Sequence, residues 1–214
     1  MTNHKTGGLF AFVEGVIYII GFVFLLAFME PNLSKELTQL NKLEFILTHK
    51  TIFQLWHLII YVLFGVILIP LVIAIKESFT NKSLLGTKVA PVFGFIWAGF
   101  VIASGMISNI GLNVLENQFL QDSETALTMW KTIAIVQGGL AGGVEVVGRL
   151  WVLLLSISAI NEKLYSSAFN YLGLVVGTTG ILTVIPGLED LGAVFGITQI
   201  VWFIWIGLYL FRQK

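Results

Sequence analysis

Two side chains of opposite charge interrupt a long run of glycine and hydrocarbon residues. The segment "GGLAGGVEVVGRLWVLLLS", residues 138–156, carries Glu145 and Arg149 four positions apart. With the acid on the N-terminal side, this order favours an ion pair within one helix. Intramembrane charges are costly and are usually functional. The pair therefore predicts either a structural clamp or a site that exchanges protons or binds an anion.

Helical spacing places both charges on the face that also carries small residues. At about 100° per residue, the members of this face fall within roughly 60° of one another: Gly138, Gly142, Glu145, Arg149 and Ser156. Glycines on one helix face let a neighbouring backbone approach closely. We expect this face to turn toward protein and away from lipid.

A third charged residue, Glu14, lies inside the first apolar run. At a rise of about 1.5 Å per residue, Glu145 lies near the bilayer midplane and Arg149 about 6 Å toward the cytoplasm, within reach of Glu14. We expect the Arg149 guanidinium to lie between the two carboxylates. One excess negative charge then remains, so either one carboxyl is protonated or another cation is nearby.

A second polar layer is expected closer to the outer surface, roughly 9–12 Å below the boundary on four different helices. Its members are His57, Asn109, Gln137 and Gln199. Tyr61, Thr178 and Thr179 could extend the lining of a water-filled vestibule. Interhelical hydrogen bonds also hold membrane bundles together, at about 0.6 kcal/mol each. A structural role for this layer is therefore an open alternative, and a lone histidine such as His57 is more often a hydrogen-bonded core residue than a ligand.

The composition indicates which elements position these groups. Of 214 residues, 57% are hydrophobic and 11% charged, whereas soluble domains carry about 25% charged residues. Six apolar segments are long enough to cross roughly 30 Å of hydrocarbon. They lie near residues 8–29, 51–75, 89–115, 130–159, 164–186 and 192–212. We predict an all-α, single-domain bundle of six transmembrane helices, the first of them an uncleaved span.

The distribution of basic residues predicts the orientation. With the N-terminus in the cytoplasm, seven basic residues flank the spans on the inner side and four on the outer side. The inner set is Lys5, Lys76, Lys82, Lys88, Lys163, Arg212 and Lys214, and the outer set is Lys35, Lys42, Lys50 and Lys131. Both termini are expected in the cytoplasm, in a chain embedded in the inner (plasma) membrane.

An amphipathic segment separates the first two spans. In "LSKELTQLNKLEFIL" the leucines recur at helical spacing, at Leu33, Leu37, Leu40, Leu43 and Leu47. The segment is too polar to span a membrane. We expect either an interfacial helix at the outer surface or a lid packed on the bundle.

Several chemistries are excluded or weakened. The absence of cysteine excludes thiolate chemistry, and one histidine within the spans does not suffice for a haem with two histidine ligands. No span carries the internal lysine that a Schiff base needs. The depths of Glu14, His57 and Glu145 differ by more than about 10 Å, so no metal site and no cofactor are expected. Zero net charge and the lack of a basic cluster argue against nucleic acid.

Four segments carry a family resemblance: "AFVEGVIYIIG", "VFGFIWAGFVIASGMISNIG", "GGVEVVGRLWVLLLS" and "ITQIVWFIWIGLYL". Their glycine- and tryptophan-rich helix faces resemble those of bacterial multi-pass membrane proteins of the domain-of-unknown-function 4386 family, over nearly the whole chain. The resemblance implies a bacterial inner-membrane helical protein and supplies no reaction. Arg149 departs from it, because a small residue is expected there.

The leading functional hypothesis is a membrane protein that handles a small solute or protons. Glu145 and Glu14 would exchange protons, Arg149 would be their counter-ion and an anion contact, and His57 an outer gate or relay. One alternative is a structural partner of another membrane protein, or of a second copy, without turnover. The other is a membrane-embedded enzyme that modifies lipid.

Overall fold

The computed structural model describes residues 3–33, 36–80, 85–140, 146–185, 187–188 and 191–213, and these ranges contain helices and turns but no strand. The helices follow one another as α1 (Asn3–Phe24), the π-helical η1 (Leu25–Met29), α2 (Glu30–Asn32), α3 (Gln39–Thr48), α4 (Lys50–His57), the π-helical η2 (Leu58–Leu63), α5 (Phe64–Glu77), α6 (Leu85–Phe119), α7 (Ser123–Leu140), α8 (Val146–Glu162), α9 (Ser167–Leu182) and α10 (Leu191–Arg212). The predicted all-α class is confirmed.

Four helical stretches are long and apolar enough to cross a membrane, so the chain has the character of a membrane protein. They are His4–Asn32, Lys50–Glu77, Leu85–Phe119 and Leu191–Arg212. The apolar α9 has 16 residues, about 24 Å at 1.5 Å per residue, which is shorter than the hydrocarbon core of roughly 30 Å. Of the stretch expected as one span at 130–159, the structure describes the parts that lie in α7 and α8, and residues 141–145 lie outside the described chain.

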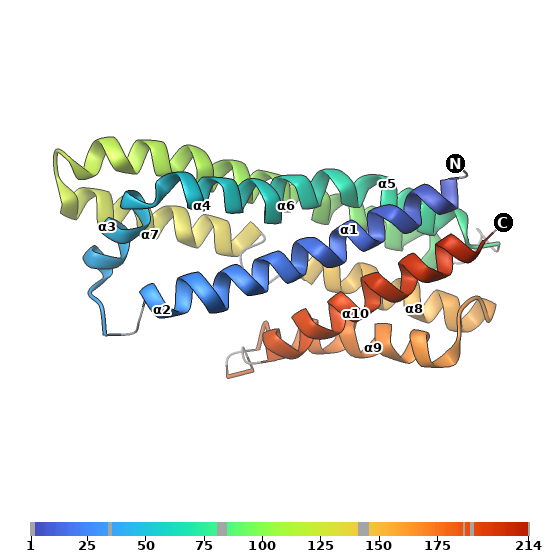
Figure 1. The fold of residues 1–214 in the computed structure, drawn as a ribbon. Coiled ribbons are helices and arrows are strands. Elements are labelled where there is room, and N and C mark those ends of the chain that lie inside the picture. The colour runs from blue at the N-terminus through green and yellow to red at the C-terminus, as the bar shows by residue number, and fades with distance from the viewer. Residues whose placement is uncertain are drawn as a thin grey trace.

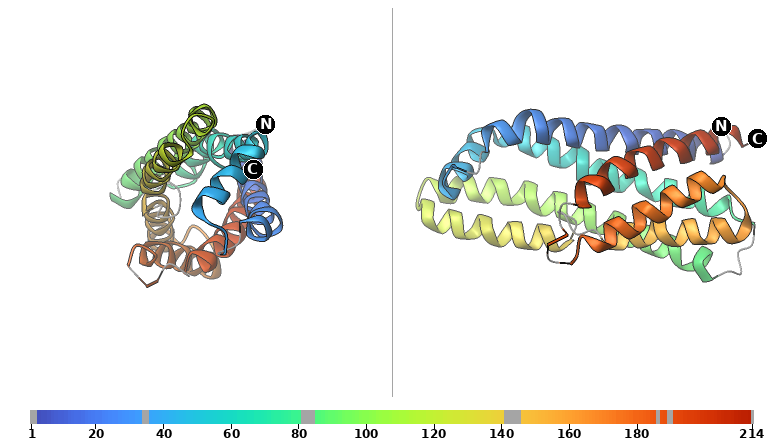
Figure 2. Two further views of the ribbon diagram at one scale, coloured as in Figure 1. Left: turned by 90° about the vertical axis from the view of Figure 1, so that its left-hand side faces the viewer. Right: turned by 90° about the horizontal axis from the view of Figure 1, so that it is seen from below.

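The helices form an elongated bundle in which α1 begins, and α10 ends, at the same end (Figure 1). We call this the proximal end and the opposite one the distal end. The 35-residue α6 and its partner α7 reach furthest toward the distal end, where α3 lies beside them (Figure 1). α7 and α8 follow one another along the bundle (Figure 2). By contrast, α9 ends and α10 begins part-way along it.

Small residues set the register between the antiparallel α1 and α10. A Cβ atom on Gly8 would lie 3.0 Å from the Gly207 carbonyl oxygen, and one on Gly196 would lie 2.4 Å from the Phe22 ring. Glycine at these positions lets the two helices approach closely. Phe22 therefore lies at the level of Gly196, and Gly8 at the level of Gly207.

Three fully buried tryptophans join the helices at the centre of the bundle. The ring centroids are 5.8 Å apart for Trp97 and Trp151 and 5.5 Å apart for Trp151 and Trp202. Phe64 and Phe169 continue the series at its two ends, 5.0 Å from Trp97 and 5.7 Å from Trp202. Aromatic pairs at these separations contribute beyond their buried area, so this series ties α5, α6, α8, α9 and α10 together.

The amphipathic segment after the first span forms a shorter helix than expected. Thr38 caps α3, since its hydroxyl accepts a hydrogen bond from the Asn41 N–H at 3.2 Å, so Leu33 and Leu37 precede the helix. Leu43 is fully buried in a cluster with Leu115 of α6 and Leu127 of α7. This apolar face packs on protein, as the lid alternative predicts.

Candidate functional site

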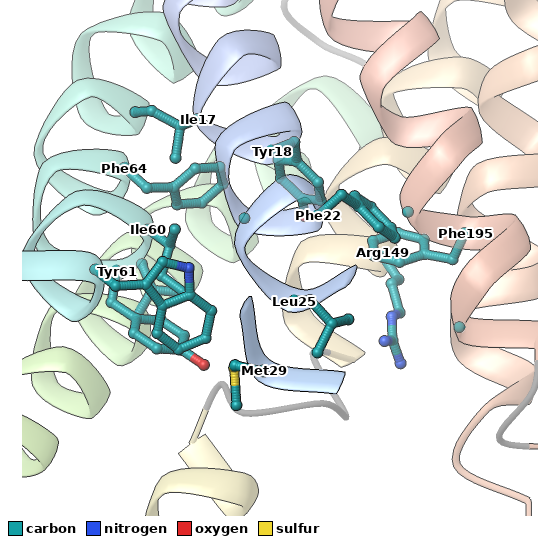
Figure 3. A pocket seen from close by; sticks show the side chains of 15 residues that line it. Ile17, Tyr18, Phe22, Leu25, Met29, Ile60, Tyr61, Phe64, Arg149 and Phe195 are labelled. Atoms are coloured by element: carbon teal, nitrogen blue, oxygen red, sulfur yellow. The ribbon is translucent and has the colours of Figure 1, made fainter. Parts of the chain in front are cut away.

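A cavity of about 370 Å³ opens between the distal half of α1 and the first turns of α8 and α10. Figure 3 shows this cavity from close by. Its lining residues come from eight helical elements and are mainly apolar: Ile17, Tyr18, Gly21, Phe22, Leu25, Met29, Trp56, Ile60, Tyr61, Phe64, Val101, Arg149, Gly192, Phe195 and Gly196. Arg149 is the one charged side chain in this set.

Arg149 is 2% exposed and lies in the first turn of α8. Its side chain crosses Gly180 of α9, where a Cβ atom would lie 2.4 Å from the Arg149 Cγ. Nη1 donates a hydrogen bond to the Thr183 hydroxyl, which in turn donates to the Gly180 carbonyl. The guanidinium carbon lies 4.6 Å from the centroid of the Phe195 ring. The guanidinium is therefore held by α9 and α10 at the cavity wall.

The opposite wall carries aromatic groups with polar ends. Tyr61, predicted as a lining residue, faces Arg149 and Phe195 across the cavity (Figure 3). Trp56 stacks on Phe24 with centroids 4.9 Å apart, and its buried indole N–H has no hydrogen-bond partner among the described residues. The cavity thus pairs a cationic wall with an amphipathic aromatic one.

The expected contact between Arg149 and Glu14 is wrong. Glu14 is fully buried in α1, and neither of its carboxylate oxygens has a hydrogen-bond partner in the described chain. Arg149 packs on Phe195, and the next residue, Gly196, lies opposite Phe22. Eight residues separate Phe22 from Glu14, about 12 Å along the helix. The guanidinium projects across the bundle to α9 and α10 and does not descend along α8. Glu145, the third predicted member, lies outside the described residues.

The predicted outer layer is formed in part. His57 and Asn109 meet, with 3.2 Å between His57 Nδ1 and Asn109 Oδ1, so the imidazole donates. Two residues that the sequence reasoning missed complete this group. Gln54 Nε2 donates to the Asn109 carbonyl at 3.2 Å and to Asn113 Oδ1 at 3.0 Å. Gln54 lies one turn before His57, and that spacing is the signal that could have identified it.

Gln199 does not share the level of His57. Trp56, beside His57, stacks on Phe24 of α1, whereas Gln199 lies near the level of Tyr18, about 9 Å away along α1. Equal depths were expected from the ends of the apolar runs, but α10 begins part-way along the bundle (Figure 1). Gln137 lies on α7, half-buried, outside the cavity lining.

Thr178 and Thr179 do not line the cavity. Their hydroxyls donate to carbonyls of their own helix, Thr178 to Leu174 and Thr179 to Val175, each at 2.7 Å. Thr183, which was not among the expected residues, is the threonine that contacts Arg149. Sequence alone does not separate a threonine that bonds its own helix from one that faces a neighbour, because both satisfy the hydroxyl.

No protein-family model, curated protein or solved structure matches this chain. The resemblance to the domain-of-unknown-function 4386 family stays a prediction.

Proposed function

We propose that the chain is a multi-pass inner-membrane protein that binds a small amphipathic anion in the cavity at Arg149 and handles it as a solute. The proposal includes six crossings, with α7–α8 and α9 adding to the four long spans, and both termini in the cytoplasm. The observation that carries it is the Arg149 guanidinium, which is the one charged group among the described residues that line this mainly apolar cavity.

The chemistry of the walls defines the class of ligand. A guanidinium binds a carboxylate through paired, charge-assisted hydrogen bonds. The apolar side chains on the remaining walls favour a hydrocarbon tail, at about 25 cal/mol per Å² of apolar surface removed from water. A volume of about 370 Å³ falls within the usual range for small-molecule sites. A medium-chain carboxylate such as octanoate satisfies all three conditions.

The charge of Arg149 is tested by comparing octanoate with its neutral counterpart octanamide. Equilibrium binding to the purified protein in lipid nanodiscs is expected to favour octanoate in the wild type. Arg149→Met should lower octanoate affinity at least about tenfold, because it removes charged hydrogen bonds of roughly 1.5–3 kcal/mol, and should leave octanamide binding unchanged. Equal octanoate affinity in a folded Arg149→Met protein would contradict the proposal.

The location of the site is tested by filling the cavity. Gly192 lines it, and a Cβ atom there meets nothing within 4 Å, so Gly192→Phe places a ring in the space without a backbone clash. This variant should abolish octanoate binding. Gly99→Phe is the matched control, since Gly99 is also open but faces outward from α6. Loss of binding in both variants, or in neither, would place the ligand elsewhere.

A further inference from the structure

Two polar side chains are sealed in the bundle beside the cavity. Glu14 of α1 and Gln199 of α10 are both 0% exposed. Their four side-chain oxygen and nitrogen atoms have no hydrogen-bond partner among the residues described. Buried polar groups are almost always satisfied by protein or by ordered water. The two side chains therefore mark a place where another hydrogen-bonding species belongs.

Both residues lie one helical turn from the cavity lining, on its proximal side. Glu14 precedes Tyr18 by four positions, and Gln199 follows Phe195 by four and Gly196 by three. Residues at these spacings are neighbours on one helix face, and Tyr18, Phe195 and Gly196 all line the cavity. The facing helices α1 and α10 thus each place one polar side chain at the proximal end of the cavity.

The register between the helices brings the two groups near each other. A Cβ atom on Gly15 would lie 3.8 Å from the Phe203 Cβ and 3.9 Å from the Ile200 carbonyl oxygen. With Phe22 at the level of Gly196, Gln199 lies near the level of Tyr18. Glu14 is four residues further, about 6 Å along the axis. One or two water molecules can bridge side chains at this separation.

The described charges around Glu14 are distant. The titratable residues on the elements packed against α1 are Tyr61 of η2, Lys76 and Glu77 of α5, and Tyr209 and Arg212 of α10. Gly7 packs on Ala74, which places Lys76 about two turns from Glu14. Gly8 lies opposite Gly207, which places Tyr209 and Arg212 proximal to it, at least about two turns from Glu14. Tyr18 lies on α1 itself, one turn from Glu14, and Tyr61 lines the cavity further away. Among the described residues, Tyr18 is therefore the titratable group nearest to Glu14.

An ionised carboxyl without donors in such a place loses its hydration and gains nothing in return. We propose that Glu14 and Gln199 form an internal proton-binding site, bridged by water, that loads and releases its proton through the cavity. In loading, hydronium at the cavity side gives a proton to a carboxylate oxygen of Glu14 and leaves as water. Release reverses this transfer, and the Gln199 amide hydrogen-bonds the water in both states. The site needs the cavity only as an access route and does not depend on anion binding.

Infrared spectroscopy of the protein in lipid nanodiscs tests the site directly. The wild type should show the C=O stretching band of a protonated carboxylic acid that shifts on transfer to D₂O and converts to carboxylate bands as pH rises. Glu14→Gln should remove this band. Gln199→Met, which keeps the side-chain length, should shift its frequency because the hydrogen-bonding partner is lost. Gly192→Phe should slow the exchange in D₂O at least about tenfold, and Gly99→Phe should not.

The outcomes separate this proposal from anion binding. Absence of an acid band that depends on Glu14 at any pH overturns it, as does a band that neither titrates nor exchanges. A band unaltered by Gln199→Met removes Gln199 from the site. Should Glu14→Gln not fold, ¹³C-carboxyl-labelled glutamate assigns the wild-type band by its isotope shift, and the pH and D₂O criteria still apply. None of these results depends on whether octanoate binds.

Discussion

The guanidinium carbon of Arg149 lies 4.6 Å from the centroid of the Phe195 ring, which joins the first turn of α8 to the first turns of α10. A cation over an aromatic face gains roughly 0.5–2 kcal/mol, with the upper end at desolvated sites. Arg149 is almost completely buried. The ring therefore replaces part of the hydration that the guanidinium gives up, and it fixes the charge at the cavity wall.

Replacing the ring tests this contact. Phe195→Leu should lower the free energy of unfolding by about 2 kcal/mol, since it removes the cation–π interaction and part of a buried side chain. Phe195→Tyr keeps the ring and should retain most of the stability. Denaturant titration in detergent micelles, followed by tryptophan fluorescence, measures both. Equal losses in the two variants would show that the aromatic face contributes nothing specific to Arg149.

Glycine at the centre of the bundle gives a second prediction. A Cβ atom on Gly148 would lie 2.4 Å from the Trp97 ring, so Gly148→Ala should destabilise the protein by about 1–3 kcal/mol through overpacking. The same substitution at Gly99 meets nothing within 4 Å and should stabilise the helix by about 0.5–1 kcal/mol. Thermal melting of the two variants side by side checks the opposite signs. A similar loss at both positions would show that the contact with the Trp97 ring does not explain the effect of Gly148→Ala.

The sequence predicts the apolar helical segments well, but it predicts contacts between side chains of different helices poorly. Length and hydropathy are properties of one segment, so the runs that contain α1, α5, α6 and α10 could be recognised without a partner. The contact between Glu14 and Arg149 required the depth of two residues on different helices, counted as if each helix ran straight through the bilayer. The Arg149 side chain instead crosses Gly180 of α9 and packs on Phe195 of α10, and contacts of this kind between helices leave no signal in the sequence.

The expected depth of a polar residue was more reliable for residues on neighbouring helices. His57 and Asn109, which were expected at one depth, are hydrogen-bonded to each other, and α4 packs against α6. Gln199 was misplaced since the start of α10 depends on how far the hairpin with α9 extends. That length is set by tertiary packing and leaves no periodic signal.

The turn before α7 predicts a pH dependence of stability. Asp122 Oδ2 accepts a hydrogen bond from the Thr125 hydroxyl at 2.6 Å, and Oδ1 accepts from the backbone N–H groups of Glu124 and Thr125. The bonds from Thr125, with the hydroxyl first, lower the pKa of Asp122 below its usual value. A depressed folded-state pKa means stability that is present above the unfolded value of about 3.9 and is lost as pH falls through the folded value.

Asp122→Asn should therefore flatten the acid side of the stability profile. The amide oxygen still caps α7 but does not titrate. Melting temperatures measured from about pH 7 to about pH 3 should differ between wild type and variant at neutral pH and converge at low pH. Parallel profiles over the whole range would show that the protonation of Asp122 does not affect folding.

Substitutions at Asn109 and Asn113 test whether the hydrogen-bonded group of His57, Asn109, Gln54 and Asn113 has a structural role or a binding role. Asn109 Oδ1 accepts from His57, and Asn109 Nδ2 donates to the Gln54 carbonyl at 3.1 Å. Asn109→Leu removes both bonds and should cost about 1–3 kcal/mol of unfolding free energy, since membrane interhelical bonds contribute about 0.6 kcal/mol each, up to about 1.7, and a buried imidazole loses its partner. Asn113→Ala removes one bond from Gln54 at an exposed position and should cost much less. Because neither asparagine lines the cavity, octanoate affinity should be unchanged in both variants. A loss of octanoate binding in a folded Asn109→Leu protein would instead make His57 and Asn109 part of the route to the cavity, as the sequence-based vestibule hypothesis holds.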